Sequence, residues 1–138
     1  MTAPEIITKL NAQTPHFIHM LGGKAVAVDI AEKTCTFEFD VSTKFCHSVN
    51  VVQGGFVTSM LDASMSHAVF ALGENIINVS SLEIKTTFLE PTLAGRLTAM
   101  GKIIKYTYKT AFMEGHLYNE DGTLLAIASS VAKLVREK

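Results

Sequence analysis

The sequence predicts an α+β fold in which one long helix packs on an antiparallel sheet. An apolar run from Gly55 to about Leu72 is too long for a typical strand. Alternating, strand-like segments lie in one block before this run and in another after it. Such a layout favours an antiparallel sheet over a parallel α/β sheet. The 138 residues and 48% hydrophobic content fit a single domain, residues 1–138.

The first twenty residues are expected to form a helical segment. Ile6, Ile7 and Leu10 recur at helical spacing, and Pro15 should interrupt the helix. Residues 24–41 then alternate between apolar and polar side chains around the turn-like "AEKT". This second pattern predicts a hairpin of two antiparallel strands.

The long helix should end at Gly73, because glycine is favoured just beyond a helix C-terminus. Three strand-like segments follow, 77–89, 95–119 and 123–135, separated by Pro91 to Gly95 and by "NEDG". They predict three or four longer strands.

Asp62 is the only formally charged side chain from Gln53 through Leu72. No Lys or Arg lies one turn away to neutralise it, and burying an unpaired carboxylate costs several kcal/mol. One interpretation is a solvated polar stripe with Ser66 and its neighbours. The other is a cleft carboxylate that acts as nucleophile or general base, with a pKa raised by its apolar surroundings.

Gly54 and Gly55 open the helix, where free backbone N–H groups and the helix dipole favour a developing oxyanion. The pair could instead permit a tight turn or close packing. Gly54 and Asp62 are eight positions apart, about 12 Å along a helix, so they cannot both grip one carbonyl. If both act on one group, Asp62 must come from a second subunit in a two-fold dimer.

These residues resemble the hotdog-fold acyl-CoA thioesterases of the phenylacetate-pathway (PaaI-like) type. The family's "HGG" is matched by "QGG" at 53–55, and Asp62 has the family's nine-residue spacing from the His position. The segment "SSLEIKTTFLEPTLAG" places the family's Ser or Thr at Ser81. With "YNEDGTLLAIASSVAKLV" as the last hairpin, the resemblance covers about residues 15–135.

The resemblance implies a sheet wrapped around the helix, dimers that pair their sheets edge to edge and often assemble as tetramers. It also implies hydrolysis of an acyl-CoA thioester to a free acid and coenzyme A, with no cofactor or metal. By carry-over, the Gly54 N–H polarises the carbonyl, Asp62 of the other subunit attacks it or activates water, and Ser81 orients the water or the carboxylate.

The sequence departs from the family pattern at two positions. Gln53 replaces the usual His and cannot titrate, although its amide can hydrogen-bond to the thioester or the loop. The upstream Asn or Gln position falls on His47, and Asn50 is near enough to take that role. The residues that we expect to contact substrate are His47 and Asn50 of this loop, together with Gly55 and Ser66 of the helix.

Two other functions fit the same residues. Hotdog hydratases and dehydratases pair a loop His with a helix acid, and His47 and Asp62 could form that pair. A non-catalytic acyl-CoA-binding module would tolerate the loss of the family His, but it needs no buried acid.

A net charge of −1 argues against nucleic acid or an anionic membrane as the main partner. No signal-like start or long apolar run occurs, so a cytoplasmic protein with reduced Cys35 and Cys46 is expected.

His67 is expected to be structural. Six apolar residues are expected in the core, with an acyl pocket as the alternative: Phe56, Met60, Met65, Phe70, Phe88 and Phe112. The candidates for binding coenzyme A phosphates are Lys102, Lys105, Lys109, Lys133 and Arg136.

Overall fold

The computed structural model describes residues 1–137. Its helices are α1 (Ala3–Ala12), α2 (His16–Met20), the 3-10 helix η1 (Thr43–Phe45) and α3 (Gly54–Leu72). Its strands are β1 (Gly23–Asp29), β2 (Thr34–Val41), β3 (Ile76–Phe88), β4 (Gly95–Tyr106), β5 (Thr110–Asn119) and β6 (Leu124–Arg136).

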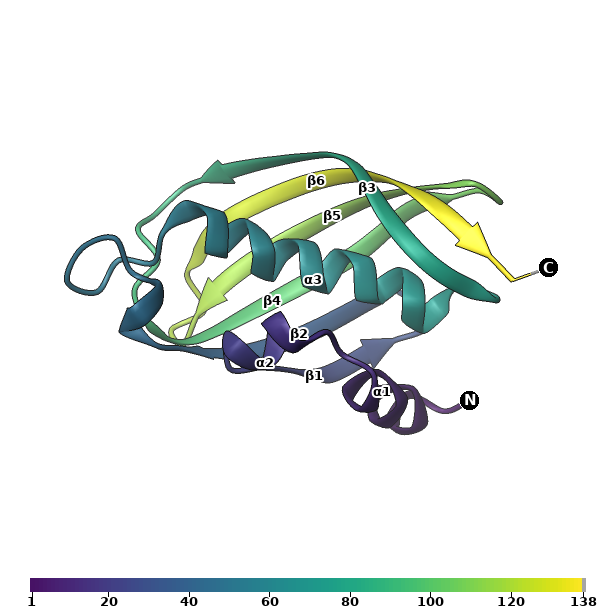
Figure 1. Ribbon diagram of the computed structural model, residues 1–138, viewed down its shortest axis with the longest axis horizontal. Coiled ribbons are helices and arrows are strands. Elements are labelled where there is room, and N and C mark those ends of the chain that lie inside the picture. The colour runs from purple at the N-terminus through teal and green to yellow at the C-terminus, as the bar shows by residue number, and fades with distance from the viewer. Residues whose placement is uncertain (138) are drawn as a thin grey trace.

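All six strands form one antiparallel sheet in the order β1-β2-β4-β5-β6-β3. Helix α3 lies across one face of this sheet, and β3 and β6 curve past it (Figure 1). The predicted α+β fold is therefore confirmed. Four strands follow the helix because the segment 95–119 folds back on itself as β4 and β5.

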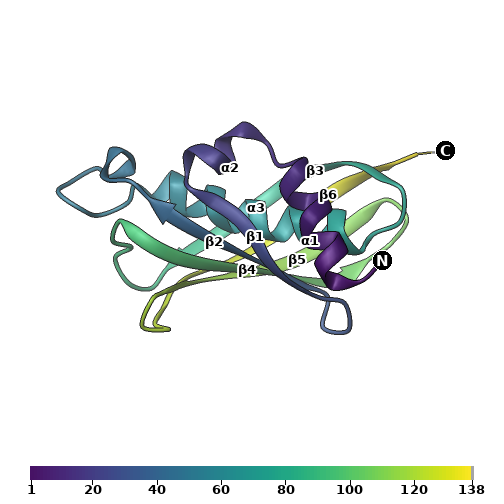
Figure 2. The same ribbon diagram turned by 90° about the horizontal axis from the view of Figure 1, so that it is seen from below.

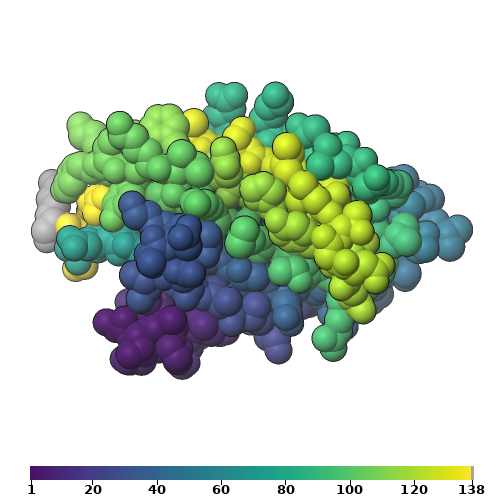
Figure 3. All heavy atoms as spheres, turned by 180° about the vertical axis from the view of Figure 1, so that it is seen from behind, coloured from purple at the N-terminus to yellow at the C-terminus, as the bar shows by residue number. Residues whose placement is uncertain are grey.

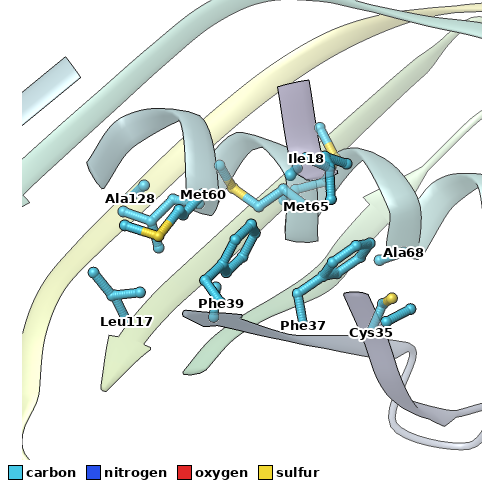
Figure 4. Close-up of a cluster of buried hydrophobic side chains, with 14 of the residues drawn as sticks. Ile18, Cys35, Phe37, Phe39, Met60, Met65, Ala68, Leu117 and Ala128 are labelled. Atoms are coloured by element: carbon cyan, nitrogen blue, oxygen red, sulfur yellow. The ribbon is translucent and has the colours of Figure 1, made fainter. Parts of the chain in front are cut away.

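The core forms between α3 and the sheet face beneath it. Along β2, Phe37 and Phe39 are buried while the intervening Glu38 is exposed, as the pleat of a strand requires. Both rings point from β2 towards α3, whose Met60 and Met65 are fully buried (Figure 4). Burying one such side chain stabilises the fold by about 1.5–3 kcal/mol.

Small residues bring the sheet close to the helix. A Cβ added to Gly101 on β4 would lie 2.2 Å from the carbonyl oxygen of Ser64 on α3. A Cβ added to Gly115, which pairs with Gly101 across β4 and β5, would lie 3.2 Å from the Leu61 and Met65 side chains. Glycine at these positions fixes how deeply α3 sits on the sheet.

The N-terminal segment forms two helices, which confirms its predicted helical character and the break at Pro15. Thr2 and Glu5 form a capping box that satisfies free donors at the start of α1. Both α1 and α2 lie near the β1 side of the sheet (Figure 2). The Asn11 side chain both donates to and accepts from the Ala25 backbone of β1, at 2.9 and 2.8 Å. This pair of bonds partly occupies the outer edge of β1.

The other sheet edge, β3, carries no such covering element in residues 1–137. Four large apolar side chains on and just after β3 are exposed: Ile77, Leu82, Phe88 and Leu89. The sheet face opposite α3 is also open, and strand side chains form its surface (Figure 3). Bare β-strand edges are templates for pairing with another chain.

The expectation of a core position was wrong for three of the apolar residues. Phe56, Phe88 and Phe112 are exposed, whereas Met60 and Met65 are fully buried. Alternation placed Phe112 on the open sheet face, and the edge location of β3 leaves Phe88 uncovered.

The two cysteines are free, as expected. No helix within residues 1–137 has the length and apolarity needed to cross a bilayer.

Candidate active site

The start of α3 carries the predicted oxyanion-binding group. Gln53 is the N-cap, and its side-chain oxygen accepts a hydrogen bond from the Gly55 N–H at 2.8 Å. A Cβ at Gly55 would lie 2.8 Å from this oxygen and would displace the cap. The Gly54 N–H, in contrast, has no acceptor in the described part of the chain, so it is available to a ligand.

The structure brings His47 and Gly54 together on the wall of one cavity of about 440 Å³. Phe88 closes over the helix start, since a Cβ at Gly54 would lie 3.1 Å from its ring. Thr92 also lines the cavity and is buried, and its Oγ1 has no hydrogen-bond partner among residues 1–137. Sequence reasoning missed Thr92 as a site residue, and for Phe88 it favoured the core over an acyl pocket.

Asn50 does not join His47 on this wall in the described structure. Its side chain is exposed, and its backbone carbonyl accepts a hydrogen bond from the Ala94 N–H at 2.8 Å. The His47 N–H donates to the Val51 carbonyl at 3.0 Å and closes the loop between them. His47 is therefore better placed than Asn50 to contact a ligand at the Gly54 end.

Asp62, in the middle of α3, is half-buried between hydroxyl groups. Its Oδ1 accepts hydrogen bonds from Ser81 Oγ at 3.2 Å and from Ser66 Oγ at 3.4 Å. Ser66 lies one helical turn beyond Asp62, and Ser81 comes from the neighbouring edge strand β3. The three residues that the sequence singled out around this acid are thus brought together.

A bulge in β3 accounts for the orientation of Ser81. Ser81 pairs with Ala132 and Glu83 pairs with Val131, so Leu82 is the extra residue on the bulged strand. In a strand without this extra residue, strict alternation would not allow both Ser81 and the helix-facing residues after it to point towards α3. Leu82 itself is 65% exposed.

Burial raises the pKa of Asp62 above the ordinary value of 3.8, while the Ser81 and Ser66 hydroxyls oppose this rise. With its pKa raised, the Asp62 carboxylate is more basic than an exposed aspartate. It can accept a proton from water or attack an electrophilic carbon.

Within one chain the two halves of the candidate site are separate. Asp62 does not line the cavity that Gly54 lines. The two residues are eight positions apart on α3, which corresponds to about 12 Å along the helix axis.

Two of the candidate phosphate-binding cations have protein partners. Arg136, at the end of β6, donates to the backbone carbonyls of Glu74, Thr107 and Tyr108. It thereby links β6 to the segment before β3 and to the turn between β4 and β5. Lys102 forms an ion pair with Glu32 at 3.6 Å. The side chains of Lys105, Lys109 and Lys133 are exposed.

Comparison with known proteins gives a family and a fold. Residues 49–126 match the model of the thioesterase superfamily. A phenylacetic acid degradation-related protein of Ralstonia eutropha JMP134 has 26% identity and a TM-score of 0.84, covering 96% of this chain and 99% of that one. A thioesterase-like protein of Streptococcus pneumoniae TIGR4, solved with coenzyme A, has 16% identity and a TM-score of 0.77, covering 89% and 95%.

A curated relative from Schizosaccharomyces pombe is 30% identical over 92 residues, which are 67% of this chain and 49% of the relative. The chain thus spans about half the length of that protein. The family match covers the helix with Gly54 and Asp62 together with strands β3 to β5. Taken with the six-stranded sheet wrapped around α3, it shows that this chain has the hotdog fold and belongs to the thioesterase superfamily.

Proposed function

We propose that this protein is an acyl-CoA thioesterase that hydrolyses its substrate to a free acid and coenzyme A. One observation carries the proposal: a half-buried carboxylate, Asp62, held by two hydroxyl donors on an otherwise apolar helix. A structural role does not account for an acid in this position, because no cation pairs with it in the described chain. Membership of the thioesterase superfamily supports hydrolysis as the reaction.

The reacting thioester lies between two subunits of a two-fold dimer. The Gly54 N–H of one subunit donates to the carbonyl oxygen, and Asp62 of the partner subunit lies on the opposite side of the carbonyl carbon. The uncovered β3 edge, with its exposed Ile77, Leu82 and Phe88, supports such a dimer, since pairing two β3 edges would set the two α3 helices antiparallel. His47, Phe88 and Thr92 line the approach to the Gly54 end.

In the general-base route, Asp62 takes a proton from water as the water oxygen bonds to the carbonyl carbon. The negative charge that develops on the carbonyl oxygen is stabilised by the Gly54 N–H. Collapse of this tetrahedral species breaks the C–S bond and releases the coenzyme A thiolate, which is a good leaving group. In the nucleophilic route, Asp62 attacks the carbonyl carbon and displaces the coenzyme A thiolate to form an anhydride, which water then opens. Ser81 holds the carboxylate in position in both.

The decisive experiment measures free-thiol release from short, long and aromatic acyl-CoA thioesters with wild type and the Asp62→Asn variant. We expect the variant to retain its fold and oligomeric state and to lose about 10²–10⁴-fold in kcat. Glu83→Gln, on the same strand as Ser81, is the matched control and should retain full turnover. Unchanged hydrolysis by Asp62→Asn would contradict the proposal.

Single-turnover hydrolysis in labelled water separates the two routes. Label found first in Asp62, with an unlabelled first product acid, would identify an anhydride opened at the Asp62 carbon. Label found only in the released acid would exclude that route and leave attack of water on the substrate carbon, either in the thioester or in an anhydride. Gln53→Ala should reduce turnover less than Asp62→Asn does, because its amide caps Gly55 and carries no titrating group. A loss as large as that of Asp62→Asn would mean that Gln53 contacts the reacting group.

The presence of His47 in the Gly54 cavity favours a second candidate, a hydratase or dehydratase that uses His47 and Asp62. Crotonyl-CoA distinguishes the two functions. Hydration removes the conjugated absorbance without freeing a thiol, whereas hydrolysis frees the thiol. Binding of acyl-CoA with neither reaction would identify a binding module. The coenzyme A in the Streptococcus protein supports acyl-CoA as the ligand in all three cases.

A further inference from the structure

A second cavity, of about 450 Å³, lies between α1, the C-terminal half of α3 and the start of β3. Its volume is in the range that holds small organic ligands. Neither Gly54 nor Asp62 lines it. About half of its wall is apolar, and this part includes Ile6, Leu10, Phe70, Ala71, Ile76 and Ile77.

His67 is the polar group of α3 on this wall. It is only 7% exposed, and its ring packs edge-on against Phe37, with 5.1 Å between ring centroids. Its Nδ1 lies 2.8 Å from the Ala63 carbonyl oxygen. Because a carbonyl oxygen only accepts hydrogen bonds, Nδ1 must carry the proton in this contact. Burial lowers the pKa of His67, so the ring is neutral near pH 7 and its Nε2 is an acceptor.

No group within residues 1–137 donates to this Nε2. Because His67 lines the cavity and its Nδ1 is already bonded to Ala63, Nε2 is the ring nitrogen left to accept a hydrogen bond from a ligand. Lys9 of α1 lies on the same cavity wall and supplies a cation. The wall thus combines apolar side chains with the His67 acceptor, the Lys9 cation and the polar side chain of Gln13.

We propose that this cavity binds a small carboxylic acid with an apolar body, whose hydroxyl group donates to His67 Nε2 and whose carboxylate pairs with Lys9. The site is separate from the proposed thioester site and does not require hydrolysis. The same chemistry is offered by an acid taken up from solution and by an acid released from a hydroxylated thioester.

The test compares two acids that differ by one hydroxyl group, phloretic acid and hydrocinnamic acid. Calorimetry with the Asp62→Asn variant measures binding without turnover, and the imidazole NMR signals report on His67. We expect phloretic acid to bind about 10-fold more tightly, as one buried hydrogen bond permits. We also expect it to shift the His67 signal, while those of His116 on β5 stay in place.

Four variants locate the interaction. His67→Phe keeps an aromatic ring against Phe37 but removes the acceptor, so it should abolish the preference for phloretic acid. Lys9→Gln should weaken both acids by a similar factor, and Lys24→Gln, outside the cavity, should weaken neither. Ala71→Phe should fill the cavity and prevent binding of both.

The source of the acid is tested by adding the phloretic acid thioester of coenzyme A. A His67 shift in wild type but not in Asp62→Asn would identify the released acid as an occupant, whereas phloretic acid added directly should shift both proteins. Failure of both acids to bind at millimolar concentration would overturn the proposal. A hydroxyl preference that survives His67→Phe would overturn it as well. Neither result would bear on thioester hydrolysis.

Discussion

At the scale of single residues, Asp62 should reduce the stability of the protein at neutral pH. Its folded-state pKa is raised above the ordinary 3.8, chiefly by burial, so the folded protein holds the proton more tightly than the unfolded chain. The free energy of unfolding therefore falls as pH rises from the ordinary pKa through the folded-state pKa, and this loss persists at higher pH.

Asp62→Asn removes the buried charge, and we expect it to raise the free energy of unfolding at pH 7 by about 0.5–1 kcal/mol. The gain should shrink as pH falls, because protonated Asp62 resembles Asn. Urea denaturation at fixed protein concentration and several pH values measures both effects. A stability gain that grows towards acid pH would show that the sign is wrong.

The Ser81 hydroxyl opposes the rise in the pKa of Asp62, which gives a kinetic prediction. In Ser81→Ala, we expect the acidic limb of the kcat/KM profile to move to higher pH, since a donor to the charged carboxylate is lost. Ser80→Ala, at the adjacent and exposed position, should leave the limb where it is. A lower rate with an unmoved limb would mean that Ser81 acts only on substrate.

Sequence reasoning identified Asp62, Ser66 and Ser81, and the structure joins all three. Charge pattern and helical spacing gave the first two, whereas Ser81 needed the resemblance to a family. Thr92 was missed, and Phe88 was assigned first to the core, because the role of both depends on how the chain at the end of β3 and just after it folds over the helix start. No local pattern of residue types reports such a contact.

At the scale of elements, glycine on two neighbouring strands sets the spacing between helix and sheet. We expect Gly101→Ala to reduce the free energy of unfolding by about 2–3 kcal/mol, because its Cβ would meet the rigid Ser64 backbone at 2.2 Å. Gly115→Ala should have a smaller effect, since it meets the flexible side chains of Leu61 and Met65 at 3.2 Å. Equal losses in thermal or urea denaturation would contradict this account.

The elements themselves were largely predictable. The long helix, the first hairpin and the turn at "NEDG" all form where composition and periodicity indicated. The boundary between β4 and β5 was not assigned, because the segment 95–119 carries no Gly or Pro where the chain turns, at Thr107–Lys109. The β3 bulge was also not predicted, since only pairing with β6 reveals that Leu82 is the extra residue.

At the scale of the whole molecule, the two edges of the sheet differ. Asn11 hydrogen-bonds to the outer edge of β1, whereas β3 is uncovered within residues 1–137 and exposes the large apolar side chains of Ile77, Leu82 and Phe88. The sequence could not distinguish these edges, because strand order is a property of long-range pairing. This asymmetry leads to a prediction about assembly: copies of the chain associate first through β3.

Leu82→Lys tests that prediction by placing a charge on the bare edge, where Leu82 is 65% exposed in the single chain. We expect sedimentation to show dissociation to monomers and thioester hydrolysis to fall with it, because Gly54 and Asp62 would no longer meet across the interface. Ile104→Lys, on the open face of the sheet, is the matched control and should preserve dimers and turnover. If the protein is a dimer of dimers joined through that open face, the control should convert tetramers to active dimers. A Leu82→Lys monomer with full turnover would contradict the composite site. Gly54 and Asp62 would then have to act within one chain, although they lie eight positions apart on α3.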